Sequence, residues 1–110
     1  MHPARIDRKS HTQDAGKRCP GHRAFVRRHA CSACGSMTNI ECAHIRDGNG
    51  GGISMKPSDR HCVSLCAECH RRQHEMGEGP FWRQAGKDPN ALASGFVTAS
   101  PHRAKVSVMP

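Results

Sequence analysis

Two Cys-x-x-Cys pairs, Cys31/Cys34 and Cys66/Cys69, constrain this chain more than any other feature of the sequence. Thirty-one residues separate the two pairs. Each pair lets two sulfurs from one tight turn bind the same ion, and four thiolates at this spacing are typical of a tetrahedral zinc site. Four protein ligands leave no position for water, so we expect a structural zinc ion that joins two distant segments.

The composition indicates why such a staple is needed. The chain has 110 residues, of which 35% are hydrophobic and only 4% aromatic, and its mean hydropathy is −0.70. A domain of this size and composition cannot bury a large apolar core, and small domains of this kind depend on disulfides or a metal.

The seven cysteines favour a metal over disulfides. The first 20 residues are polar and basic, and no apolar run is long enough for a signal peptide or a membrane span. We therefore expect a cytoplasmic protein with no membrane partner, and in that compartment paired cysteines usually bind metal. An odd number of cysteines also argues against complete disulfide pairing. Cys42 and Cys62 fall in predicted strands, where we expect them to be small packing residues.

The net charge of +8 is concentrated in the two ends of the chain. Residues 1–30 carry a net +6, residues 31–79 a net −1 and residues 80–110 a net +3. Basic segments around a near-neutral centre favour binding to the phosphate backbone of nucleic acid. The alternative is that they only keep the chain soluble.

The pattern of apolar and turn residues predicts a small α+β domain over residues 21–99. We expect residues 1–20 to form a disordered basic arm and residues 100–110 a flexible tail. Gly77 should end a helix, and Pro80 and Asp88-Pro89 should begin two more. The predicted elements are a helix at 21–30, strands at 39–45 and 61–65, a helix at 67–76 and two helices between 80 and 99.

Four of the nine histidines have an ordered placement. His70 and His74 are four residues apart on a predicted helix, so both project from one face and could share a cation. His44 ends the first predicted strand and His61 begins the second. A single histidine is more often an ordinary surface or core residue, but four that converge on one zinc-anchored unit indicate a site.

Three motifs around these histidines resemble the HNH nuclease family and its zinc-stapled ββα-metal fold. They are Ala-His-Ile-Arg at 43–46, Lys-Pro-Ser-Asp-Arg at 56–60 and Leu-Cys-x-x-Cys-His-x-x-x-His at 65–74. The resemblance is closest to small phage and prophage HNH proteins, and it covers roughly residues 21–99.

The resemblance implies roles for the four histidines. His44 matches the general base that activates water, and His61 stands where a residue orients that base or shapes the hairpin loop. His70 matches a ligand of the catalytic divalent metal, and His74 resembles a further ligand one helical turn on. The implied catalytic set is His44, His61 and His70.

The chain departs from the family pattern at Ala43. Many relatives carry an aspartate or histidine there that binds the catalytic metal, whereas alanine offers no ligand atom. Glu41 and Asp59 are candidate substitutes. The implied metal is Mg²⁺ or Mn²⁺, and because imidazoles are softer ligands than carboxylates, Ni²⁺ or Zn²⁺ are also possible. Arg46 and Arg60 are candidates for holding the flanking phosphates, or are ordinary surface arginines.

We therefore expect a metal-dependent endodeoxyribonuclease that hydrolyses phosphodiester bonds in DNA. One alternative is a non-catalytic, zinc-stabilised module that binds nucleic acid through its basic segments. Another is a structural zinc scaffold that recruits a protein partner.

Overall fold

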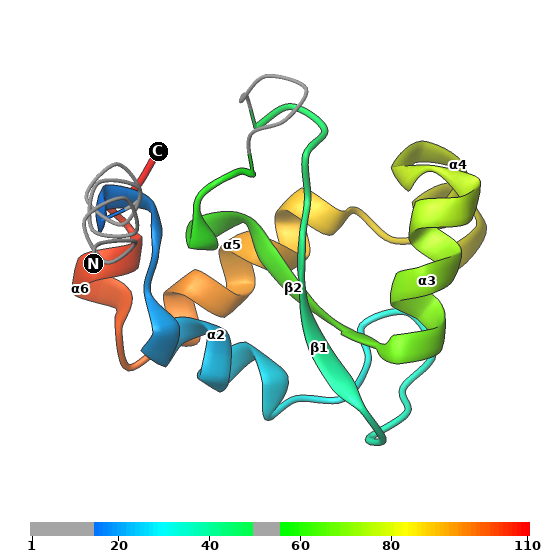
Figure 1. Ribbon diagram of the computed structural model, residues 1–110, viewed down its shortest axis with the longest axis horizontal. Coiled ribbons are helices and arrows are strands. Elements are labelled where there is room, and N and C mark those ends of the chain that lie inside the picture. Colours follow the sequence, from blue (N-terminus) through cyan, green and yellow to red (C-terminus); the bar gives the residue numbers. More distant parts are fainter. Residues whose placement is uncertain (1–14, 50–55) are drawn as a thin grey trace, which may run out of the picture.

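The fold places a two-stranded sheet among several short helices (Figure 1). The structure is a computed structural model, and it describes residues 15–49 and 56–110. In chain order the elements are the 3-10 turn η1 (Ala15–Lys17), α2 (Pro20–Arg27), β1 (Ile40–His44), the 3-10 turn η2 (Asp59–His61), β2 (Cys62–Cys66), α3 (Ala67–Met76), α4 (Glu78–Ala85), α5 (Pro89–Ala99) and α6 (Arg103–Val106). The predicted α+β class is confirmed.

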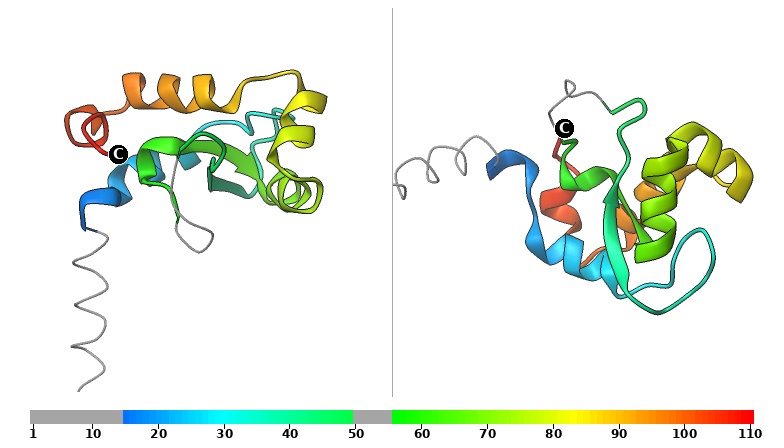
Figure 2. Two further views of the ribbon diagram at one scale, coloured as in Figure 1. Left: turned by 90° about the horizontal axis from the view of Figure 1, so that it is seen from above. Right: turned by 45° about the vertical axis from the view of Figure 1, so that its right-hand side comes forward.

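The sheet pairs β1 with β2 in antiparallel register, from Ile40 opposite Cys66 to His44 opposite Cys62. All five residues of β2 are buried. Helix α5 packs against β2 and η2, while α2 packs against both strands. Figure 2 shows α5 running along one side of the sheet. Strand β2 is therefore enclosed by the elements that pack on it. In β1 only Ala43 is buried, and the other four side chains are at least partly exposed.

Local signals in the sequence set the helix boundaries. Helix α3 spans the predicted residues and ends at Gly77, whose φ of +92° favours glycine. Asp88 caps α5 by accepting hydrogen bonds from the amides of Asn90 and Ala91, and Pro89 occupies the first turn. Helix α4 begins at Glu78, two residues before the predicted start at Pro80.

The main core lies where β2 meets α4 and α5. Ile45, Val63 and Leu65 are fully buried there, together with Phe81 and Trp82 of α4. The one polar contact of the indole is satisfied inside this core, because Nε1 of Trp82 donates to Oε1 of Gln73 at 2.7 Å. No helix in the described part of the chain is long and apolar enough to cross a bilayer.

The two ends of the chain differ from the prediction. In place of a flexible tail, the C-terminal segment forms α6, and Val106 and Met109 are buried against Cys19 and Val97. Residues 15–20, assigned to the disordered arm, include η1 and the start of α2; residues 1–14 of that arm lie outside the described residues. The tail has too few apolar residues for a periodic pattern, so only tertiary packing shows that it is ordered.

The buried tail predicts a stability difference between two valines. Val106→Ala removes methyl groups from a fully buried position, so it should lower the free energy of unfolding by about 1–3 kcal/mol. Val108 is 81% exposed, and Val108→Ala should change that free energy by less than about 0.5 kcal/mol. Urea unfolding of both variants provides the measurement. Equal effects of the two substitutions would show that the tail is not packed.

Candidate functional site

The four predicted zinc cysteines come together at one end of the sheet. Cys31 and Cys34 lie on the turn before β1, Cys66 ends β2, and Cys69 lies in the first turn of α3. Their sulfurs all lie within 4.8 Å of one another, and those of Cys34 and Cys66 are 3.8 Å apart. A tetrahedral ion about 2.3 Å from each sulfur requires sulfur separations of about 3.8 Å.

The backbone of the first Cys-x-x-Cys turn is preformed for this arrangement. The amide of Cys31 donates to the carbonyl of Ser36 at 2.7 Å, and the amide of Gly35 donates back to the carbonyl of Cys31 at 2.9 Å. Gly35 has a φ of +82°, a conformation that favours glycine. Hydrogen bonds within the turn therefore fix the backbone that carries Cys31 and Cys34.

The electrostatics of the four thiols also suit a cation. Burial would raise the pKa of Cys31, but backbone amides, that of Cys66 foremost, bring the pKa down to about 6. Burial and the neighbouring sulfurs raise the pKa of Cys69. The Cys31 thiolate therefore forms readily, while Cys69 resists ionising beside it, and a divalent ion would remove that repulsion. The four cysteines are thus placed to hold a zinc ion.

Removing the metal should unfold the domain. The purified chain should carry about one zinc ion, and a chelator should abolish its helical circular dichroism until zinc is restored. Cys34→Ser removes one ligand, so it should lower the zinc content and the stability. Cys42→Ser is the matched control, because Cys42 lies outside the cluster. A chain that stays folded without metal would contradict the structural role.

A second site is a cavity of about 550 Å³ between α2, β1 and α3, which we call the histidine cavity. The cavity brings three of the four predicted histidines together with basic side chains from α2 and from the segments that follow β1 and precede η2. Its lining consists of Arg23, Arg27, Glu41, Cys42, His44, Arg46, Lys56, His70 and His74. Four of these side chains are cationic and only one is a carboxylate. The cavity thus has the charge expected of a phosphate site.

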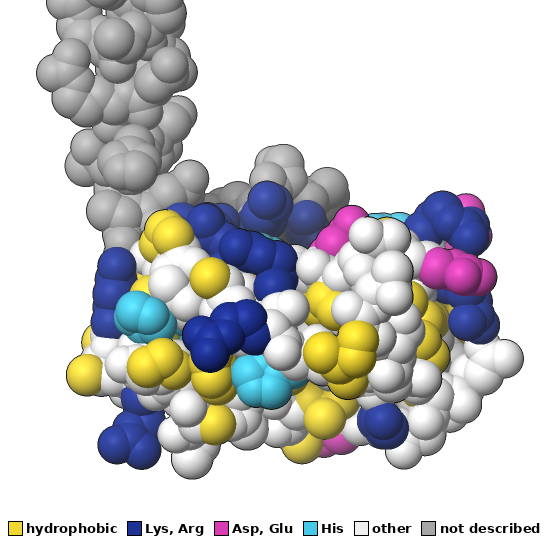
Figure 3. Space-filling model, turned by 90° about the horizontal axis from the view of Figure 1, so that it is seen from below, with side chains coloured by type: hydrophobic (Ala, Val, Ile, Leu, Met, Phe, Trp, Pro, Cys, Tyr) yellow, Lys and Arg dark blue, Asp and Glu magenta, His cyan; other side chains and the backbone are white. Residues whose placement is uncertain are grey.

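The basic character continues outside the cavity. Figure 3 shows Lys and Arg side chains gathered over α2 on the face seen from below. Helix α2 supplies Arg23 and Arg27 to the cavity wall, and Arg28 follows directly after the helix. The predicted nucleic-acid contact Arg46 lines the cavity as well.

His70 is held by a carboxylate on the neighbouring strand. Its Nδ1 lies 2.8 Å from Oε1 of Glu41, and its ring centroid lies 4.9 Å from that of His74. An ionised carboxylate can only accept, so Nδ1 carries the proton and Nε2 keeps its lone pair for a ligand. Metal-binding histidines commonly have such a partner. Among the described residues, however, no group of three closely spaced ligand atoms includes His70 or His74.

Ala43 does not contribute to the cavity. It is fully buried in the main core, where its strand partner is Val63. Of its two candidate substitutes as a metal ligand, Glu41 reaches His70, while Asp59 lies beneath His44. An ion bound at His70 and His74 would therefore have to complete its shell with water or a substrate.

Asp59 is fully buried and accepts hydrogen bonds from several directions. Nε2 of His44 lies 2.8 Å from Oδ1, and the amide of Cys19 donates to Oδ2 at 2.6 Å. Arg23 donates to Oδ2 as well, and Arg18 lies 3.4 Å from Oδ1. Burial would raise the pKa of Asp59, but the hydrogen bonds from His44, Cys19 and Arg23 outweigh it and lower the pKa to about 2.

His61 and Arg60 do not line the histidine cavity, so the structure does not bring these two predicted site residues together with the other three histidines. Nε2 of His61 lies 2.9 Å from the carbonyl oxygen of Pro110, and Arg60 donates to the carbonyls of Ser107 and Met109. Turn η2 directs both side chains toward the C-terminal segment. The residue of that turn that contacts His44 is Asp59, which the sequence suggested only as a metal ligand.

Cys62 is fully buried and Cys42 half-buried, so the prediction of a buried packing residue holds for Cys62 and only partly for Cys42. The thiol of Cys42 and burial together raise the pKa of Cys62. Cys62 also lies close to the ligand atoms of His44 and Asp59. Since both oxygens of Asp59 already accept hydrogen bonds, we interpret this group as a buried polar cluster and not as a metal site.

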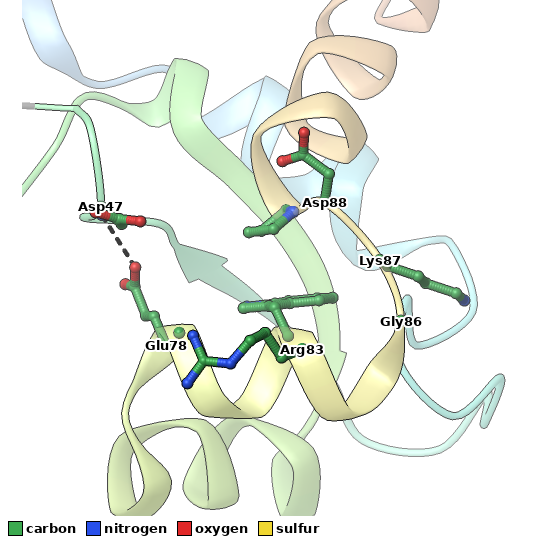
Figure 4. Close-up of a pocket in the computed structure, with 9 residues that line it drawn as sticks. Asp47, Glu78, Arg83, Gly86, Lys87 and Asp88 are labelled. Atoms are coloured by element: carbon green, nitrogen blue, oxygen red, sulfur yellow. Dashed lines mark hydrogen bonds between the residues drawn. The ribbon is translucent and has the colours of Figure 1, made fainter.

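Another cavity, of about 420 Å³, lies between α4 and the start of α5 (Figure 4). Three of its polar side chains, those of Glu78, Lys87 and Asp88, have structural partners. Glu78 accepts hydrogen bonds from the amides of Arg46 and Asp47, at 2.8 and 3.0 Å. Lys87 points away from the other side chains in Figure 4 and donates to the carbonyl of Ser32. Glu78 therefore serves the histidine cavity indirectly, by fixing the backbone of Arg46.

The chain was compared with family models, with curated proteins and with solved structures. None of the three comparisons returned a match. The resemblance to HNH nucleases therefore depends on the motif residues alone.

The low pKa of Asp59 predicts how stability depends on pH. Because the folded pKa of about 2 lies below the ordinary value of 3.8, ionised Asp59 should contribute about 2 kcal/mol above pH 5. That contribution should be lost as the pH falls from about 4 to about 2. Urea unfolding of the parent and Asp59→Asn should therefore show a difference that shrinks on acidification. Because acid also protonates the zinc cysteines, the comparison is made only at pH values where both chains still carry zinc. A difference that grew toward the acid end of that range would contradict the prediction.

Proposed function

We propose that this chain is a metal-dependent endonuclease of the HNH type that hydrolyses phosphodiester bonds in DNA. The observation that carries the proposal is that His44, His70 and His74 line one cavity with four cationic side chains. The three histidines come from two elements, β1 and α3, whose junction with the zinc cysteines fixes their spacing.

His44 is the general base in this proposal. It takes a proton from a water molecule while the oxygen of that water forms a bond to phosphorus and the bond to the leaving 3′-oxygen breaks. An imidazole suits this task because its ordinary pKa of about 6.5 lies near working pH. The cationic side chains Arg27, Arg46 and Lys56 would hold the phosphates on either side of the cleaved bond.

His70 and His74 are the residues that would hold the catalytic divalent ion, Mg²⁺ or Mn²⁺, with Ni²⁺ or Zn²⁺ as alternatives. When bound, such an ion neutralises negative charge that develops on the phosphate and the leaving oxygen. Glu41 contributes by holding the His70 ring in place through Nδ1.

A second candidate is a non-catalytic, zinc-stabilised module that binds nucleic acid. The buried Ala43 and the absence of a three-ligand group at His70 among the described residues favour it. In that case the cationic cavity wall would bind DNA in a salt-dependent way, with no cleavage in any metal. Binding would then be unaffected by His44→Ala.

Cleavage of supercoiled plasmid distinguishes the two candidates. The zinc-loaded chain should nick the plasmid only after Mg²⁺ or Mn²⁺ is added. Chelators are avoided because they would also remove the structural zinc. His44→Ala should lower the cleavage rate by about 10²- to 10⁴-fold, because it removes the base. His70→Ala should raise the concentration of Mn²⁺ needed for half-maximal cleavage.

His61→Ala is the matched control, since His61 faces the C-terminal segment. It should retain the parent rate. Cleavage that is unchanged in His44→Ala would contradict the proposed base, and retained DNA binding without cleavage in any metal would favour the second candidate.

A further inference from the structure

A buried carboxylate, that of Asp59, lies beneath His44 and has no role in the function proposed above. Asp59 is fully buried, whereas the His44 side chain keeps 15% of its surface exposed. The two meet through Nε2 and Oδ1 at 2.8 Å, across 15 residues of sequence. A hydrogen bond between a buried carboxylate and the base is a specific arrangement, because an isolated carboxylate at that depth would be strongly unfavourable.

Asp59 is itself held firmly in place. The Cys19 amide and Arg23 both donate to Oδ2, which leaves Oδ1 directed at His44. Burial places the group in a medium where such charge-assisted hydrogen bonds are stronger than in water. The contacts come from α2, from the residue before it and from β1, so Asp59 cannot move without disturbing several elements.

The ionisation of Asp59 determines which ring nitrogen of His44 carries a proton. The donors around Asp59 keep its pKa near 2, so the carboxylate is ionised at neutral pH and can only accept. The ring nitrogen facing it must then carry a proton. In neutral His44, Nε2 is therefore the N–H and Nδ1 is the nitrogen with a free lone pair.

We propose that Asp59 is a positioning residue for His44, which fixes the imidazole as the Nε2–H tautomer so that Nδ1 is the atom that accepts the proton from water. This inference rests on the proposed endonuclease function. After proton transfer the ring is an imidazolium, and its positive charge lies next to the Asp59 carboxylate. The same logic explains how a buried aspartate supports the histidine of a catalytic triad.

The arrangement also links α2 to the base. Arg23 donates to Asp59 and at the same time lines the histidine cavity. One guanidinium therefore contacts both the residue that orients the base and the space that would hold a phosphate. Proper orientation of His44 depends on α2 being docked on the sheet.

The tautomer can be measured in the unmodified, zinc-loaded chain. Long-range ¹H–¹⁵N NMR correlations, recorded at a pH where the ring is neutral, separate the two tautomers of His44. The spectrum of His44→Gln assigns the signal. We expect the Nε2–H pattern. A ring with its proton on Nδ1 would overturn the proposal, even if the chain cleaves DNA normally.

Asp59→Asn tests the consequence for cleavage. We expect kcat to fall by about 10²- to 10⁴-fold while the Kd for uncleaved DNA changes less than about threefold, together with a change in the His44 tautomer signal. Asp88→Ala is the matched control, because it removes a helix cap at the start of α5 and should lower stability without changing kcat.

The outcomes separate this proposal from the proposed function. A folded Asp59→Asn chain with the parent kcat would overturn the role of Asp59 and leave the endonuclease intact. Absence of cleavage by the parent in every metal would overturn the endonuclease. If Asp59→Asn does not fold, the tautomer of the parent chain decides the matter alone.

Discussion

The clustering of four cysteine sulfurs is the contact on which the rest of the molecule depends. It joins a turn before β1 to the point where β2 ends and α3 begins. Cys66 takes part in three ways, because it ends the strand, caps the helix by accepting from the Cys69 amide, and lies in the sulfur cluster. A chain with so little aromatic content could not hold this junction by apolar packing alone. His70 follows Cys69 directly, so its position is set by the same contact.

Two carboxylates then support the two sides of the histidine cavity, in different environments. Glu41 bonds to His70 with half of its side chain exposed, whereas Asp59 bonds to His44 with none of its side chain exposed. Exposed pairs contribute little because water screens them, while a buried carboxylate with several donors is held much more firmly. The rigid support belongs to the residue proposed as the base. The more exposed contact, from Glu41, belongs to His70, whose ring would have to adjust to a bound ion.

The sequence predicted those features that depend on short spacings. The cysteine cluster and helix α3 follow from Cys-x-x-Cys pairs and a terminal glycine. The cavity residues His70 and His74 follow from a separation of four residues, and His44 from its place at the end of a predicted strand. The sequence failed at turn η2, where the side chains of Arg60 and His61 contact residues 47 and 49 positions away. No local pattern distinguishes His61 from Asp59 as the partner of His44. The only available signal was a single acidic residue within an otherwise basic and polar turn.

The three consecutive residues of turn η2 make contacts in three separate parts of the structure. Asp59 contacts β1 and α2, Arg60 contacts the C-terminal backbone, and the carbonyl of His61 accepts from the amide of Ile45. Inserting or deleting one residue there would shift all of these contacts together. In a randomised library, selection should therefore preserve the length of this turn more strictly than the identity of most residues in it.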